Sequence, residues 1–174
     1  MADKLDAILE EHDIEEDFST SLHQDEGVLL HGTDVMQEKL NTHQRIKNNL
    51  SGNVIQLEKG YAKVSLQTTH EMVIDELGLI HSGFIFSAAD FAAAAAVNES
   101  NLVIIGARTS FLAPAKVDDL IQFEAKAKFE DSRKREINVI GKIKDIKIFE
   151  GTFHAVVLEK HIFKTKIKNA HREY

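Results

Sequence analysis

The chain has 174 residues, no cysteine and a formal net charge of −7 at pH 7. This length suits one domain, and a hydrophobic content of 43% is sufficient for an ordinary globular core. The lack of cysteine excludes disulfides, thiol catalysis and cysteine-ligated metal centres. No window has the pattern of a signal peptide or a membrane span, so we expect a cytoplasmic protein.

The negative charge is concentrated at the N-terminus. Residues 1–26 contain ten acidic side chains and one lysine, a net charge of −9, whereas the other 148 residues contain 18 acids and 20 bases. We therefore predict an acidic N-terminal arm over 1–33, which serves for solubility or for docking a protein partner. Such an arm repels a polyanion, so we do not expect nucleic-acid binding.

Residues 34–52 carry the pattern of a lead-in helix. Thr33 is a suitable N-cap, apolar residues then recur with a period near 3.6, and Ser51-Gly52 is a typical end. The pattern predicts a helix over 34–50.

From residue 53 the apolar period changes to two, which is typical of half-buried strands. Two strands joined at Lys59-Gly60 form a predicted hairpin, and four longer strands follow a helical segment. The alternation changes phase near 144–146, which predicts a bulge or bend. The expected strands cover 54–57, 62–68, 102–113, 120–130, 134–148 and 152–163.

Residues 82–98 form the long helical segment between these strands, and they are apolar on nearly every side. A helix without a polar face must be buried. We therefore predict an α+β domain over 53–163, in which one antiparallel sheet curls around a central buried helix. A basic C-terminal tail is predicted over 164–174; a solvated strand end is favoured over contact with nucleic acid or a membrane.

Two motifs lie inside this domain. The first is the helix start at 78–90, with His81-Ser82-Gly83 and an acid nine residues after the histidine; the second is Phe-Leu-Ala-Pro-Ala-Lys-Val-Asp-Asp at 111–119. Both resemble conserved stretches of hotdog-fold acyl-CoA thioesterases. The region is also similar to the ligand domain of acyl-CoA-responsive regulators of lipid synthesis, and to flagella-coregulated hotdog virulence proteins of epsilonproteobacteria.

The resemblance implies a dimer with its site across the two-fold axis and with acyl-CoA as ligand. Asp90, the one charged residue of the helix, falls on the position of the catalytic acid, and Gly83 would present its N–H to the thioester oxygen. In the dimer, Asp90 of one subunit would face Asp75 and His81 of the other. A structural reading of Asp90, exposed to solvent or bonded to Ser87, is equally open from the residues alone.

Further residues match the places where relatives hold the coenzyme A phosphates. They are Arg108, Lys116, Ser132, Arg133, Lys134 and Arg135. Taken alone, Arg133-Lys134-Arg135 would be read as a solvated turn. No histidine pair has metal-ligand spacing, so we expect no metal site.

Three departures from the family pattern weaken hydrolysis. Asp75 stands where relatives carry a water-positioning Asn, Ser82 replaces a glycine, and Ile104 takes the place of a Ser or Thr. We therefore predict a homodimeric acyl-CoA-binding protein in a regulatory or effector role rather than an enzyme. The alternatives are an acyl-CoA thioesterase that uses Asp90, and a dimeric interaction scaffold whose acidic arm recruits a partner.

Overall fold

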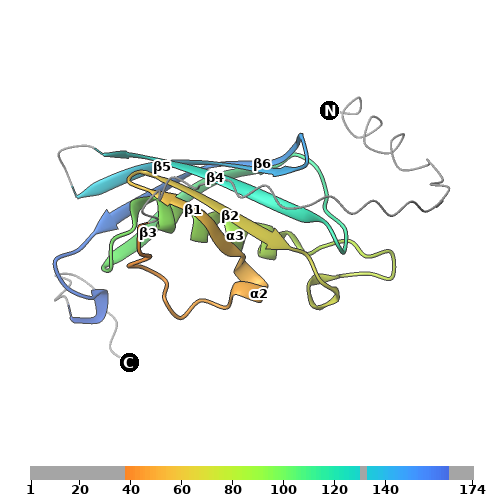
Figure 1. Ribbon diagram of the computed structural model, residues 1–174, viewed down its shortest axis with the longest axis horizontal. Helices are drawn as coiled ribbons and strands as arrows, with labels where there is room; N and C mark the ends of the chain where they lie inside the picture. Colours follow the sequence, from red (N-terminus) through yellow and green to blue (C-terminus); the bar gives the residue numbers. More distant parts are fainter. Residues whose placement is uncertain (1–37, 130–132, 165–174) are drawn as a thin grey trace, which may run out of the picture. The chain divides into compact units, whose positions relative to one another are not determined.

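The computed structural model describes residues 38–129 and 133–164. One antiparallel sheet of six strands has the order β1-β2-β4-β5-β6-β3, and helix α3 packs against one of its faces (Figure 1). The predicted α+β hotdog arrangement, a sheet around a buried helix, is confirmed. The elements are α2 (Asn48–Ser51), β1 (Asn53–Glu58), β2 (Tyr61–Gln67), η1 (His70–Met72), α3 (Ser82–Val97), β3 (Leu102–Phe111), β4 (Leu120–Phe129), β5 (Lys134–Ile143), β6 (Ile146–Val157) and η2 (Ile162–Lys164).

Helix α3 is defined at both ends by its flanking residues. His81 caps its N-terminus, and Asn98 ends it in the left-handed conformation, with its N–H bonded to the Ala94 carbonyl at 2.9 Å. The alanines at 92–96 are at most 1% exposed, because their small side chains let the strands approach the helix closely. No helix within the described residues has the length and hydropathy needed to cross a membrane.

The sheet has a dry face and a wet face, as the alternation predicts. In β4, Ile121, Phe123 and Ala125 are fully buried beneath α3, while the residues between them are less buried. The alternation fails at the strand end, where Phe129 is 45% exposed. The Arg135 guanidinium lies over that ring, 5.3 Å from its centroid.

The predicted helix over 34–50 is wrong for most of the described part. Only its last turn, α2, is helical, and residues 38–47 form an irregular segment. His43 has a φ of 49°, which an α-helix does not allow. Asn98 also binds the segment through its side chain: its Nδ2 donates to the Lys39 carbonyl at 3.0 Å, and its Oδ1 accepts the Asn41 N–H at 2.7 Å. Tertiary contacts therefore override the helical period here.

Two strand boundaries also differ from the prediction. The phase change near 144–146 is a bend, because Lys144 has a φ of 52° and lies in a hairpin turn where Ile143 pairs directly with Ile146. The register between β5 and β6 also shifts beside this turn, between Gly141 and Lys142. Strand β6 therefore starts earlier than predicted. Strand β6 ends at Val157 instead of 163. Val157 pairs with Leu102, which is the first residue of β3, so β3 offers no partner to residues beyond Val157.

Strand β3 is an edge of the sheet and is unusually exposed. Most residues of β3 are exposed, whichever face of the sheet they belong to, and they include Ile105 at 57% and Phe111 at 47%. The opposite edge is β1. An apolar edge with unpaired backbone groups is a place where a second chain can pair.

The domain boundaries stay predictions in part. The acidic arm over 1–33, the start of the lead-in segment and residues 165–174 of the predicted tail lie outside the described residues. The predicted hotdog domain over 53–163 contains the whole sheet and α3.

Candidate functional site

Asp90 lies on a stripe of α3 that the sheet leaves uncovered. Gly83, Ser87 and Asp90 share this stripe at helical spacing, and they are exposed or half-buried while the rest of the helix is mostly buried. Burial raises the pKa of the Asp90 carboxyl above its usual 3.8. Within the described residues, this carboxylate has no hydrogen-bond partner.

The structural alternative for Asp90, a bond from Ser87, is not formed. The Ser87 hydroxyl lies 2.8 Å from the Ser51 hydroxyl at the end of α2 and forms a hydrogen bond with it. Asp90 is therefore a half-buried carboxylate that the fold does not use for its own hydrogen bonding. Such a group is a candidate for ligand contact.

His43 is a neighbour of Asp90 that the sequence analysis did not identify. The negative charge of Asp90 raises the pKa of His43, although burial, the larger effect, lowers it. The imidazole packs against Phe91 with 5.9 Å between ring centroids, and its Nδ1 is 2.8 Å from the Thr42 hydroxyl. The helical period at 34–50 places His43 among apolar positions, so no sequence signal paired it with Asp90.

His81 and Gly83 form the start of α3. The Gly83 N–H donates to the His81 Nδ1 at 2.7 Å, so this histidine is the helix cap. A Cβ at Gly83 would lie 2.7 Å from the His81 ring, which explains the glycine. The same bond occupies the N–H that we expected to face the thioester oxygen. The Gly83 N–H can donate to a thioester oxygen only if the His81 ring moves away from it.

Asp75 stabilises the loop that precedes α3. Its Oδ1 accepts the N–H groups of Leu77 and Leu79, both at 3.0 Å. Asp90 lies about two helical turns from Gly83, so a single chain does not bring Asp90 together with the Asp75 loop. The expected juxtaposition needs a second subunit.

The predicted phosphate-binding cations lie in separate places. Lys116 pairs with Leu79 beside the start of α3, whereas Arg133, Lys134 and Arg135 lie at the far end of β4, beside Phe129. Arg108 pairs with Thr152 on the face of the sheet away from α3. Ser132 lies outside the described residues. One chain therefore offers two cationic regions at opposite ends of the sheet.

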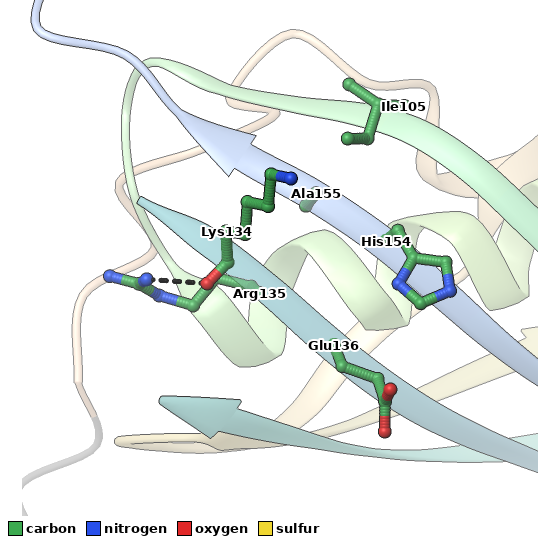
Figure 2. Close-up of a pocket in the computed structure, with 6 residues that line it drawn as sticks. All are labelled: Ile105, Lys134, Arg135, Glu136, His154 and Ala155. Atoms are coloured by element: carbon green, nitrogen blue, oxygen red, sulfur yellow. Dashed lines mark hydrogen bonds between the residues drawn. The ribbon is translucent and has the colours of Figure 1, made fainter. Parts of the chain in front are cut away.

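A hollow of about 300 Å³ lies on the outer face at the second of these regions (Figure 2). It forms where β3 bulges at Ile105, and Glu136 and His154 line it from neighbouring positions of β5 and β6. Glu136 also accepts a 2.7 Å hydrogen bond from Lys128, which lowers the pKa of its carboxyl. Arg133 is paired with Glu159. The described residues contain no group of three or more metal-ligand side chains.

Comparisons with known proteins bear on this arrangement. The family model described as Thioesterase superfamily matches residues 77–140, from the loop before α3 into β5. The crystal structure of Cj0977, a sigma28-regulated virulence protein from Campylobacter jejuni, is similar with a TM-score of 0.70 and 45% identity. The match covers 72% of this chain and 89% of that chain.

Two curated relatives are longer than the matched region. A methylthioribose-1-phosphate isomerase from Aquifex aeolicus is 42% identical over 119 residues, which are 68% of this chain and 26% of that protein. Transcription factor FapR from Thermoanaerobacter sp. strain X514 is 27% identical over 116 residues, 66% of this chain and 58% of that protein. The chain therefore matches about a quarter of the first relative and just over half of the second.

Two more distant structures share the fold and contain coenzyme A compounds. One is a hypothetical thioesterase protein with coenzyme A from Streptococcus pneumoniae, with a TM-score of 0.57 and 14% identity, over 63% of this chain and 87% of that one. The other is smu.793 from Streptococcus mutans bound to acetyl CoA, with a TM-score of 0.60 and 16% identity. This match covers 68% of the present chain and 97% of smu.793. At this identity the similarity shows the fold alone.

Proposed function

Because this chain belongs to the thioesterase superfamily of hotdog-fold proteins, we propose that it binds an acyl thioester of coenzyme A and acts through that binding in a regulatory or effector role. The resemblance carried by the two sequence motifs is confirmed at the level of the superfamily. The observation that carries the proposal is the uncovered stripe of α3, where the half-buried Asp90 has no hydrogen-bond partner among the described residues.

A homodimer completes the proposed site. Phe86, one helical turn before Asp90 in α3, is half-exposed, and the edge strand β3 also exposes Ile105 and Phe111. A second copy paired along β3 would cover these apolar side chains and bring its own Asp75 loop toward Asp90. The acyl chain would then lie between the two subunits.

The cationic regions supply the phosphate contacts of the proposed ligand. Lys116 lies near the start of α3, and Arg133 with its neighbours lies at the opposite end of the sheet. In a dimer the two regions can come from different chains and still reach one nucleotide. Contacts between charged groups and phosphate are among the stronger hydrogen bonds in proteins.

Two contacts favour binding over hydrolysis. The Asp75 carboxylate is an acceptor without a hydrogen to donate, so it offers no donor to a water or an oxyanion, and its Oδ1 already accepts the Leu77 and Leu79 N–H groups. The Gly83 N–H is held by His81. One expected donor for the transition state is thus missing at position 75, and the other, the Gly83 N–H, is engaged within the chain. The second candidate, an acyl-CoA thioesterase, is favoured by the burial of Asp90, because a raised pKa suits a general base.

Thermal-shift measurements with a panel of acyl-CoA compounds test the proposal. A ligand at 100 times its dissociation constant stabilises the native protein by about 2.7 kcal/mol. Replacing Lys116 or Arg133 with Gln should weaken binding by roughly 10- to 100-fold, the effect of losing one charge-assisted contact. Lys142→Gln, on the outer face of β5, is the matched control and should bind as the wild type does.

Binding of free coenzyme A with the same affinity as its acyl esters would contradict an acyl site. Binding of none of these compounds would favour the scaffold alternative instead.

A further inference from the structure

Ser51, the last residue of α2, brings a buried hydroxyl to Ser87 on the uncovered stripe of α3. Ser51 is only 6% exposed, and its Oγ forms a 2.8 Å hydrogen bond with the Ser87 Oγ. The next residue fixes the position of Ser51, because Gly52 packs so closely on β2 that a Cβ there would lie 2.7 Å from the Val64 side chain. The two hydroxyls therefore form a fixed contact between α2 and α3.

The two hydroxyls carry two hydrogens, and the bond between them uses only one. Neither hydroxyl has another hydrogen-bond partner among residues 38–129 and 133–164. A serine in a helix can donate to the carbonyl four residues before it, which for Ser51 is that of Lys47. That carbonyl already accepts the Leu50 N–H at 2.9 Å and the Ser51 N–H at 3.0 Å. One hydrogen of the pair therefore has no acceptor in the described part of the chain.

Burial decides which hydroxyl keeps this free hydrogen. A buried donor without an acceptor is unfavourable, and Ser51 is the more buried of the two residues. Ser87 is half-buried and lies on the part of α3 that the sheet does not cover. The favourable arrangement is therefore one in which the Ser51 hydroxyl donates to the Ser87 oxygen. The Ser87 hydrogen then stays available on the open side of the stripe.

Ser87 lies between the two residues of α3 to which the family resemblance gives a role. Gly83 is four residues before it and Asp90 three residues after it, so all three are neighbours on one face of the helix. The Gly83 N–H is already bonded to the His81 Nδ1 at 2.7 Å. The ionised Asp90 carboxylate accepts hydrogen bonds and has no hydrogen to donate. Of these three positions, Ser87 is the one with a free donor for a ligand.

We propose that the Ser87 hydroxyl donates to the thioester carbonyl of the bound ligand, and that Ser51 positions this hydroxyl by donating to its oxygen. This inference rests on the proposed function for the identity of the ligand, whereas the hydroxyl pair rests on the contact between α2 and α3. A hydroxyl that accepts one hydrogen bond is a stronger donor in the next one. The contact selects an acyl thioester over free coenzyme A or a thioether, because only the thioester has a carbonyl acceptor beside its sulfur.

Calorimetric titration with a matched pair of compounds tests the role of Ser87. One compound is an acyl-CoA, and the other is the S-alkyl coenzyme A thioether of the same chain length, which lacks the carbonyl. The wild type should bind the thioester roughly 3- to 10-fold more tightly, the effect of one neutral hydrogen bond. Ser87→Ala should remove this difference. Ser65→Ala, which removes a half-buried hydroxyl on the outer face of β2, is the matched control and should keep it.

The same ratio of affinities tests the positioning role of Ser51. Ser51→Ala should reduce the preference for the thioester by a smaller factor, about 2-fold, because the Ser87 hydroxyl stays but is no longer held in one orientation. In a Ser87→Ala background, Ser51→Ala should leave the ratio unchanged. A merely structural effect of either serine would weaken both compounds by the same factor and would not move their ratio.

Two results would overturn the role of Ser87 and leave the proposed function intact. One is a wild type that binds the thioester and the thioether equally well, a result that stands even if a variant does not fold. The other is a preference for the thioester that persists in Ser87→Ala. In both cases acyl-CoA still binds. If neither compound binds to the wild type, the proposed function fails, and the role of Ser87 fails with it.

Discussion

One carboxylate oxygen of Asp75 accepts two backbone N–H groups of the loop before α3. An asparagine at this position keeps that oxygen and adds an amide donor. If hydrolysis is blocked because the donor is missing, Asp75→Asn should raise the rate of acyl-CoA hydrolysis by roughly 10- to 1,000-fold while the loop stays folded. Steady-state thioester assays measure this gain.

The control for this variant is Asp90. In the Asp75→Asn protein, Asp90→Ala should abolish the gain and leave acyl-CoA affinity largely unchanged, since it removes the general base. The wild-type protein could instead hydrolyse acyl-CoA at about 1 per second or faster, with the activity lost in Asp90→Ala. This result would contradict the binding proposal and support the thioesterase alternative.

The raised pKa of Asp90 makes the free energy of unfolding depend on pH. Its pKa is raised on folding, so the folded state binds the proton more tightly, and this group's contribution to stability falls as the pH rises from 3.8 through the raised value. Above that window, Asp90→Asn should stabilise the protein. Because the carboxylate is only half-buried, we expect at most about 1 kcal/mol, or roughly 2–4 °C in Tm. Calorimetry at pH 7 and at pH 3.5 measures the difference, which should disappear at the lower pH.

At the scale of the element, the start of α3 depends on contact between His81 and Gly83. A Cβ at Gly83 would meet the ring at 2.7 Å, so Gly83→Ala should displace the cap and cost about 1 kcal/mol in the free energy of unfolding. In a His81→Ala background, the same change should be neutral or stabilising by up to about 1 kcal/mol, because alanine is the better helix former. Equal costs in both backgrounds, measured by denaturant unfolding, would contradict this account of the cap.

The elements that the sequence predicted well are those with uninterrupted local patterns. The alternation around Phe123 and the apolar run of α3 placed the sheet and the helix correctly. The patterns failed where tertiary contacts or single turns decide the backbone. The side chain of Asn98 holds residues 39–41 outside a helix, and a left-handed Lys144 forms a hairpin turn inside 134–148, which was predicted as one strand with a bulge or bend.

In the candidate site too, local sequence patterns identified some residues, while others depend on tertiary contacts. The two motifs led to Asp90, His81 and Gly83, because these residues lie close together in the sequence. His43 was missed, because its proximity to Asp90 depends on how a distant irregular segment lies on α3. No period in the sequence contains that information.

For the whole molecule, we expect a homodimer paired along β3. Sedimentation at micromolar concentration should give about twice the monomer mass of 19.5 kDa or more. Ile105→Asp places a charge on the exposed edge and should yield monomers. Ile140→Asp, on the outer face of β5 with 41% exposure of the isoleucine, is the control and should keep the dimer mass. A wild-type monomer at this concentration would refute the assembly.

The acidic arm is expected to be separable from the domain. Residues 1–26 have a net charge of −9 and few large apolar side chains, so they cannot form a core. Deleting them should leave the Tm and acyl-CoA affinity nearly unchanged and alter solubility or partner binding. Loss of folding after the deletion, seen by circular dichroism, would show that the arm is part of the domain.

Isothermal titration calorimetry of the full chain with acyl-CoA tests the central claim most directly. We predict saturable binding with one ligand per chain, affinity that increases from free coenzyme A to its acyl esters, and weaker binding as salt rises because the phosphates are held by cations. No saturable heat with any acyl-CoA, at protein concentrations where the dimer is formed, would contradict the account.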